Sequence, residues 1–260
     1  MKLEGKVCLV TGAAGGIGYG IAKRFVEHGA RVAVADLAIA RAEEAAGRLG
    51  LSGPGAAFAI AMDVTREEAV VSGVHDIASR WGRIDVLVAN AGIQIVHRIE
   101  DYPFEDWKKM MAVHVDGAFL TTKSCFPVMK RQGGGAIIYM GSVHSKEASV
   151  LKSAYVTAKH GLLGLARTVA KEGAPHGIRS NVICPGFVRT VLVEKQIPEQ
   201  ALALGISEQD VIRNVMLGTT VDGEFTTIED VAETAVFLAA FQTNALTGQS
   251  INVSHGWHIQ

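Results

Sequence analysis

The strongest constraint on the fold of this chain is a regular alternation of short apolar runs with segments of helical periodicity. Seven runs rich in apolar and β-branched residues predict strands at 6–10, 31–35, 57–62, 85–89, 136–140, 179–183 and 250–253. Segments with apolar residues at helical spacing lie between them at 17–28, 39–49, 66–81, 104–131 (bent at Pro127), 154–172 and 228–240. The predicted strands lack polar alternation, so we expect both faces of their sheet to be buried. The pattern predicts an α/β fold with a seven-stranded parallel sheet and helices on both faces.

Length and composition favour one domain spanning residues 1–260. The chain is 48% hydrophobic and 20% charged, which suits a large folded core and not a disordered segment. One stretch, 188–223, interrupts the alternation, because it contains no predicted strand and many polar residues. A long insertion between a late strand and the last helix is expected to form a helical substrate lid.

Charge and cysteine content exclude several classes of partner. With 25 basic and 26 acidic residues the net charge is −1, so we expect no nucleic-acid partner. No apolar run approaches the roughly 18 residues of a membrane span, and the first residues do not fit an export signal. Cys8, Cys125 and Cys184 each lie inside apolar runs, which predicts buried thiols in a reducing compartment, the cytoplasm.

A glycine-rich loop joins the first predicted strand to the first predicted helix. Small residues in such a loop let backbone amides approach a pyrophosphate, and the helix N-terminus adds favourable charge. An isolated glycine cluster is equally typical of a tight turn, but its position after the first strand of an α/β alternation favours a dinucleotide site of the Rossmann type. The residues expected to form it are Thr11, Gly12, Gly15, Gly16, Ile17 and Gly18.

Polar residues also follow the next predicted strands. Asp36 ends the second strand, where a carboxylate can bind both ribose hydroxyls of a dinucleotide and repel a 2′-phosphate, which predicts NAD as the cofactor. The alternative for Asp36 is a helix cap. Asp63 and Val64 follow the third strand, and Asn90 and Gly92 follow the fourth, as cofactor contacts or as ordinary turns.

A tyrosine and a lysine lie four residues apart at the start of the predicted helix 154–172. Tyr155 and Lys159 therefore share one face of that helix. A nearby ammonium stabilises a phenolate, so we expect Lys159 to lower the pKa of Tyr155 and make it a general base for alcohol oxidation. Taken alone, the pair is also typical of an amphipathic helix surface.

With these motifs the whole chain resembles the short-chain dehydrogenase/reductase family. The segments that carry the resemblance are 11–18, 90–92, 141–142, 155–159 and 185–186. The resemblance implies that Ser142 holds the substrate oxygen, that Tyr155 exchanges its proton, and that Lys159 also binds the nicotinamide ribose. It further implies a homotetramer, and no catalytic metal is predicted.

Two further groups of residues acquire roles from the same resemblance. Pro185, Gly186, Val188 and Thr190 resemble the segment that meets the nicotinamide carboxamide, through the Val188 backbone and the Thr190 hydroxyl; the alternative is a Pro-Gly turn. Family members usually have an asparagine, supporting a proton-relay water, at the position of His114. We expect the imidazole to maintain this relay in a modified form.

A second set of polar residues near the expected catalytic centre has no evident role in the fold. Lys152 supplies a cation, and Gln94, His144 and Gln196 supply neutral hydrogen-bonding groups, a combination that suits a small carboxylate. The alternative for Lys152 and Gln196 is ordinary polarity of a solvated loop, and for His144 it is a satisfied histidine near a strand end.

The resemblance also implies that two aromatic residues meet the apolar end of the substrate. They are Phe187 and Trp257. Trp257 can equally pack the C-terminal tail or form a subunit contact. Other readings of the whole chain are an NADPH-dependent reductase of 3-oxoacyl thioesters, a dinucleotide-binding protein without turnover and a purely structural protein.

Overall fold

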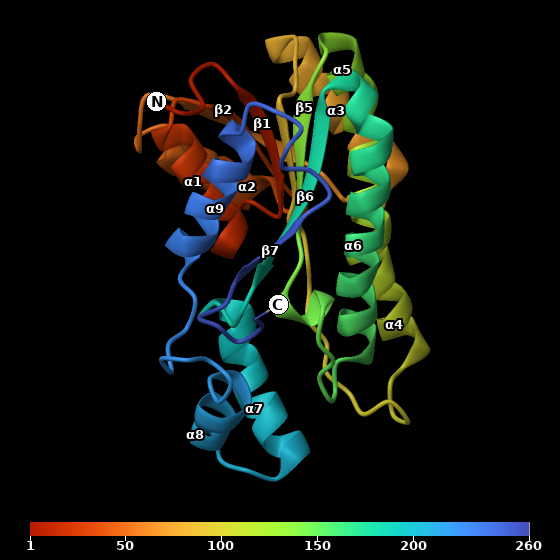
Figure 1. Ribbon diagram of the computed structural model, residues 1–260, viewed down its shortest axis with the longest axis vertical. Coiled ribbons are helices and arrows are strands. Elements are labelled where there is room, and N and C mark those ends of the chain that lie inside the picture. The colour runs from red at the N-terminus through yellow and green to blue at the C-terminus, as the bar shows by residue number, and fades with distance from the viewer. Residues whose placement is uncertain (260) are drawn as a thin grey trace.

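The computed structural model describes residues 1–259, and its centre is a sheet of seven parallel strands (Figure 1). The strand order is β3-β2-β1-β4-β5-β6-β7, and every neighbouring pair is parallel. The strands are β1 (Val7–Thr11), β2 (Arg31–Asp36), β3 (Ala56–Ala61), β4 (Val86–Ala89), β5 (Gly135–Met140), β6 (Ile178–Pro185) and β7 (Ser250–Val253). The predicted doubly wound α/β sheet is confirmed.

Helices cover both faces of the sheet (Figure 1). Helices α1 (Gly16–Glu27), α2 (Ile39–Leu49) and α9 (Ile228–Ala240) pack on one face, and their apolar residues form one core with the strands. Helices α3 (Glu67–Trp81), α5 (Gly117–Gln132) and α6 (Ser153–Gly173) form the second core on the other face. Residues of β1, β4 and β6 are buried throughout, which explains why their sequences show no polar alternation.

The predicted helix 104–131 is interrupted. It consists of α4 (Phe104–Met111), a π-helical turn η1 (Ala112–Asp116) and α5, while Pro127 lies within α5. The periodicity of apolar residues does not reveal such a turn, because one wider turn leaves the same side of the helix facing the sheet. The turn is of interest because π-helical turns frequently occur at functional sites, and η1 carries His114.

The segment 188–223 is helical and lies beyond the ends of the strands (Figure 1). It contains α7 (Val191–Leu204), α8 (Glu208–Asp210) and the π-helical turn η4 (Val211–Met216). A small apolar cluster of its own, which includes Val193, Ile197, Val211 and Met216, holds these helices together. The remaining short elements are the 3₁₀ turns η2 (Val143–Ser145) and η3 (Ala174–His176).

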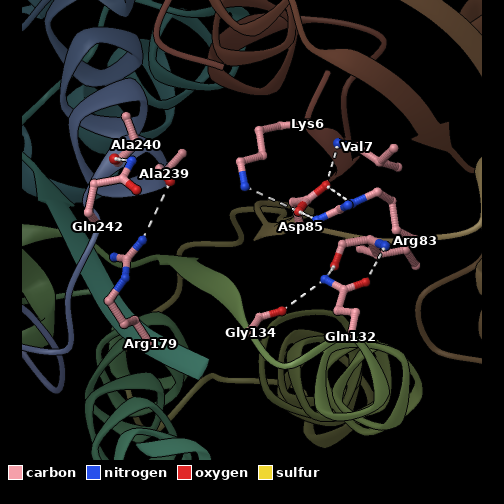
Figure 2. A network of polar contacts seen from close by, with 11 residues as sticks. Lys6, Val7, Arg83, Asp85, Gln132, Gly134, Arg179, Ala239, Ala240 and Gln242 are labelled. Atoms are coloured by element: carbon pink, nitrogen blue, oxygen red, sulfur yellow. Dashed lines mark hydrogen bonds and ion pairs between the residues drawn. The ribbon is translucent and has the colours of Figure 1, made fainter. Parts of the chain in front are cut away.

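At the opposite end of the sheet, a buried carboxylate joins the start of β1 to β4 (Figure 2). Asp85 accepts hydrogen bonds from the Val7 backbone N–H at 2.9 Å and from Arg83 Nε and Nη2 at 2.8 and 2.6 Å. Lys6 Nζ lies 3.4 Å from the same carboxylate. Charge-assisted hydrogen bonds to a buried group are among the stronger polar contacts in proteins.

We expect Asp85→Asn to lower the free energy of unfolding by about 1.5–3 kcal/mol, because the ionic hydrogen bonds from Arg83 and Lys6 are lost. Urea unfolding measures this difference. Glu67→Gln is the matched control, since it removes an exposed ion pair to Lys123 and should change stability by less than about 1 kcal/mol. Equal effects of the two substitutions would contradict a special role for the buried carboxylate.

Candidate active site

The glycine loop forms a tight turn between β1 and α1. The residue that precedes α1 is Gly15, and no side chain caps the first N–H groups of this helix. Uncapped N–H groups at a helix start favour a bound anion such as a phosphate. At Gly18 a Cβ atom would lie 2.4 Å from Gly12 O and 2.5 Å from Asn90 Nδ2, so only glycine permits this approach of the helix to the strands.

Thr11 and Asn90 join the ends of β1 and β4. Thr11 Oγ1 accepts the backbone N–H groups of Asn90 and Ala91, each at 3.0 Å, and Asn90 Nδ2 donates to Thr11 O at 2.8 Å. Thr11 is buried and does not line the cleft described below. Its side chain is therefore occupied in holding the two strand ends together.

All the other residues that the sequence predicted for the cofactor, catalytic and substrate sites line one cleft of about 640 Å³ at the carboxyl ends of the strands. The cleft extends from the glycine loop and Asp36 to Ser142, Tyr155 and Lys159, and on to Gln196 and Trp257. Its volume lies in the range of ligand sites. The open N-terminus of α1, the Asp36 carboxylate and the elongated cleft together fit a dinucleotide.

Asp36 lies at the adenosine end of such a ligand and is held by backbone groups. Its Oδ2 accepts Ala14 N–H at 3.2 Å and its Oδ1 accepts Ala38 N–H at 3.3 Å. It does not occupy the capping position of α2, which belongs to Ala38. The side chain of Asp63, by contrast, does engage a local turn, because its Oδ1 accepts both Thr65 N–H and Thr65 Oγ1.

Arg41 is a residue of this region that the sequence did not single out. It lines the cleft from the first turn of α2, and its Nη2 lies 3.4 Å from the place of a Cβ on Gly15. Arg41 lies five positions after Asp36, and its side chain extends back towards the glycine loop. Its spacing from Asp36 could therefore have predicted that it lies near the cofactor site. The leucine and valine side chains Leu37, Val113, Val191 and Leu192 also line the cleft and were not anticipated.

The candidate catalytic residues come from the end of β5 and from α6. Ser142 caps η2, and its Oγ accepts His144 N–H at 3.2 Å. Lys159 Nζ lies 5.3 Å from the centroid of the Tyr155 ring and donates to Met140 O at 2.6 Å. Ser142, Tyr155 and Lys159 thus meet at one point of the cleft.

The expected lowering of the Tyr155 pKa is wrong for the chain by itself. Burial raises the pKa of Tyr155 to about 12, and the hydrogen bond with Ser142 only partly opposes this effect. Burial also lowers the pKa of Lys159 to about 8, so the ammonium is itself poorly solvated. Desolvation dominates both shifts, and Lys159 is not among the groups that lower the pKa of Tyr155, so a phenolate here needs a further positive charge.

His114 lies on η1 and faces Tyr155. The two ring centroids are 5.6 Å apart at right angles, and His114 Nε2 lies 2.8 Å from Ile93 O and 3.2 Å from Ile93 N, so the backbone of residue 93 holds this nitrogen. Burial, together with the charge of Lys159, lowers the pKa of His114 to about 3, so the imidazole is neutral. The other ring nitrogen, Nδ1, is buried and has no partner in the protein. A cavity of about 10 Å³, the size of one water, is lined by both His114 and Lys159.

A glycine makes room for this histidine. A Cβ atom on Gly92 would lie 2.7 Å from His114 Cε1, closer than real contacts of this kind. The imidazole therefore fits only because residue 92 has no side chain.

Lys152 is a buried cation without a carboxylate partner. Its side chain is 1% exposed and forms no salt bridge among residues 1–259. Its Nζ lies 4.7 Å from the centroid of the Phe187 ring and 3.5 Å from His144 Nε2. Burial lowers the pKa of Lys152 to about 8, so the amine remains largely protonated at pH 7.

Neutral polar groups and aromatic rings surround this cation. Burial lowers the pKa of His144 to about 3, with a smaller contribution from Lys152, so His144 is uncharged. Gln94 Oε1 is buried without a hydrogen-bond partner, and the buried Gln196 donates to Leu192 O at 3.1 Å. Phe187 and Trp257 stack with centroids 5.1 Å apart. One end of the cleft thus places a cation among neutral hydrogen-bonding groups, and the adjoining wall is apolar.

Residues 1–259 contain no group of three His, Cys, Asp or Glu side chains that could hold a metal ion. Within the same range, no helix is long and apolar enough to cross a membrane.

Comparisons with known proteins agree with this geometry. The model of the short chain dehydrogenase family matches residues 6–201. The chain is 40% identical to a D-beta-hydroxybutyrate dehydrogenase of Rhizobium meliloti, with 98% of this chain and 99% of the relative covered. It is 34% identical to a 3-oxoacyl-[acyl-carrier-protein] reductase of Thermotoga maritima, over 98% of this chain and 99% of that protein. A solved structure of an NAD⁺-bound xylitol dehydrogenase is similar with a TM-score of 0.92 and 31% identity, covering 97% of this chain and 99% of the other.

We expect Lys152→Met to raise the free energy of unfolding at pH 7 by about 1–4 kcal/mol, because it removes a buried cation that has no counter-ion. The pKa of this amine is lower in the folded protein than the ordinary 10.5, so the gain is complete below about pH 8 and disappears towards pH 10.5. Urea unfolding as a function of pH measures it.

Binding of a small carboxylate anion provides a second test of the unpaired Lys152 cation. Acetate at high concentration should raise the melting temperature of the unaltered protein and leave that of the Lys152→Met variant unchanged. Sodium chloride at the same ionic strength is the control. Equal stabilisation of both proteins by acetate would show that the anion binds elsewhere.

Proposed function

The chain belongs to the short-chain dehydrogenase family, and we propose that it oxidises (R)-3-hydroxybutyrate to acetoacetate with NAD and catalyses the reverse reaction. Oxidoreductase chemistry with a nicotinamide dinucleotide follows from the family. The choice of substrate is our inference from the side chains of the cleft. The proposal also agrees with the name of the Rhizobium meliloti relative and with that of a second D-beta-hydroxybutyrate dehydrogenase from Cupriavidus necator, 38% identical over 99% of this chain.

The observation that carries the proposal is the buried, unpaired ammonium of Lys152. A substrate carboxylate would supply the counter-ion that the protein does not. The neutral His144 and the amides of Gln94 and Gln196 would complete its hydrogen bonds. The methyl end of the substrate would meet Phe187 and Trp257. The segments 142–144, 152–155, 193–197 and 254–257 resemble those of D-3-hydroxybutyrate dehydrogenase.

In the proposed mechanism the chain's own residues move one proton and position the reacting carbon. Bound NAD supplies the acceptor for the hydride that leaves C3 of the alcohol. Ser142 donates a hydrogen bond to the substrate oxygen, while Tyr155 as phenolate accepts the hydroxyl proton. The positive charge of oxidised NAD, added to that of Lys159, would lower the pKa of Tyr155 from its raised value. In the reverse direction the neutral phenol returns its proton to the carbonyl oxygen.

His114 would connect this proton to solvent. Its Nδ1 is buried without a protein partner, and the cavity that His114 lines with Lys159 has room for one water. We infer that this water passes protons between Lys159 and the outside, in the place where family members usually use an asparagine.

The preference for NAD rests on Asp36. Its carboxylate would bind the ribose hydroxyls and repel a 2′-phosphate. Arg41 acts in the opposite sense, since its guanidinium lines the same end of the cleft. We give Asp36 more weight than Arg41 in the choice between NAD and NADP, because Asp36 ends β2 directly beside the glycine loop. Ala14 N–H and Ala38 N–H hold its carboxylate there.

The proposal also covers the substrate lid, the domain organisation, the cellular compartment and the oligomeric state. The segment 188–223 would act as a substrate lid of a single domain, because it carries Gln196 and the cleft-lining residues of α7. Three buried free thiols fit a reducing compartment, and we propose a cytoplasmic homotetramer.

The decisive experiment follows NADH absorbance with each enantiomer of 3-hydroxybutyrate and with NAD or NADP. We expect turnover of the R enantiomer with NAD, at least about tenfold faster in kcat/KM than of lactate, which is one carbon shorter. The alternative, suggested by the Thermotoga maritima relative, is reduction of an acetoacetyl thioester with NADPH. Activity on the thioester and none on the free acid would replace the proposal.

We expect Tyr155→Phe to lower kcat by about 10²–10⁴-fold, the usual contribution of a general acid or base. The affinity for NADH, measured by fluorescence titration, should change little, because the aromatic ring remains. Ordinary turnover by this variant would contradict the mechanism.

A further inference from the structure

The turn that carries Trp257 has an unusual backbone. His255 and Gly256 both have positive φ, 49° and 70°, and Trp257 N–H donates to Ser254 O at 3.0 Å. This is the pattern of a type I′ turn, in which the first central residue is usually asparagine, aspartate or glycine. A non-glycine residue with positive φ is uncommon, although histidine adopts it more readily than most, and it persists where the surrounding structure holds it.

The support comes from the end of the segment 188–223. The His255 ring donates through Nδ1 to Asp222 Oδ2 at 2.7 Å, and Val221 N–H donates to His255 O at 2.9 Å. A Cβ atom on Gly256 would lie 2.7 Å from Val221 Cγ1, so the turn also packs tightly against this segment. The hydrogen bond with His255 lowers the pKa of the Asp222 carboxyl, which keeps it ionised.

Trp257 contacts two other residues of the pocket wall, so their placement depends on the placement of the turn. Its ring stacks on Phe187, with an interplanar angle of 9°, and meets the edge of His144 with centroids 5.2 Å apart. Phe187 in turn lies under the Lys152 ammonium. A shift of Trp257 therefore changes the space beside the group expected to bind the substrate carboxylate.

We propose that the clasp between Asp222 and His255 determines substrate size, because it positions Trp257 and so sets the room left for the alkyl end of the substrate. Neither Asp222 nor His255 lines the cleft, so both are positioning residues. The inference rests on the proposed function for the identity of the substrate, but the placement of Trp257 is a property of the protein alone.

The test compares three single variants of the full chain. Asp222→Ala removes the contact with His255, together with a local hydrogen bond from Glu224 N–H to Asp222 Oδ1, and leaves the residues of the turn unchanged. Asp222→Asn keeps oxygen acceptors for both. Lys123→Ala is a control that breaks an exposed ion pair outside the cleft. For each protein, kcat and KM are measured with (R)-3-hydroxybutyrate and (R)-3-hydroxyvalerate, which differ by one methylene.

In Asp222→Ala we expect the preference in kcat/KM for the shorter acid to fall about 3- to 10-fold, since one methylene in an apolar pocket decides about 10- to 200-fold. The change should appear mainly in KM, with kcat within about twofold, because the catalytic residues are not moved. Asp222→Asn should restore most of the preference, and Lys123→Ala should leave it unchanged.

A spectroscopic reading without substrate separates this inference from the proposed function. The emission of Trp257 is obtained by subtracting the spectrum of the corresponding Trp257→Phe protein, which retains Trp81 and Trp107. We expect a red shift of this emission in Asp222→Ala and none in Lys123→Ala. If the unaltered protein oxidises neither acid, the proposed function fails and the emission alone decides the clasp. An unchanged emission, or an unchanged preference in an active protein, would overturn the inference.

Discussion

The structure depends on the joint between the ends of β1 and β4. The strand order reverses here, because the chain builds outward to β3 on one side and to β7 on the other. The Thr11 hydroxyl accepts two consecutive backbone N–H groups from the far side of the joint, and Asn90 returns a hydrogen bond to Thr11 O. Because the two strand ends are held together, the glycine loop lies directly above them. The cleft is located there, at the point where the strand order of the sheet reverses.

The electrostatics of the cleft follow from desolvation. Burial lowers the pKa of Lys152 and Lys159, and it raises that of Tyr155. It also keeps His114 and His144 neutral. None of these groups has an opposite charge beside it within residues 1–259. In the function proposed above, the ligands supply the missing charges, with the substrate carboxylate at Lys152 and the cationic nicotinamide ring beside Tyr155. The same burial that destabilises the free protein therefore increases the selectivity for charged ligands.

The sequence predicted the sheet and most of the cleft because both depend on local patterns. The apolar runs identified all seven strands, and positions at strand ends led to the residues that line one cleft. Three features had no such signal. The π-helical turn η1 keeps the apolar periodicity of a continuous helix, and the burial of Tyr155 is a property of the assembled site. The structural role of Thr11 depends on Asn90, which is 79 residues away in the sequence and therefore gives no local signal.

The catalytic centre and the end of the cleft that contains Lys152 and Trp257 are held by different kinds of structure, and this has a consequence for selectivity. Ser142, Tyr155 and Lys159 are supported by the end of β5 and by α6, both packed in the second core. Lys152 and Trp257 instead follow Leu151 and His255, the non-glycine residues with positive φ in residues 1–259. Leu151 is held through its carbonyl by His97 N–H at 3.0 Å, much as His255 is held by Val221 N–H. Because these supports are loop contacts outside the sheet, changes in the loops can alter which substrate is accepted while the groups that transfer the proton stay in place.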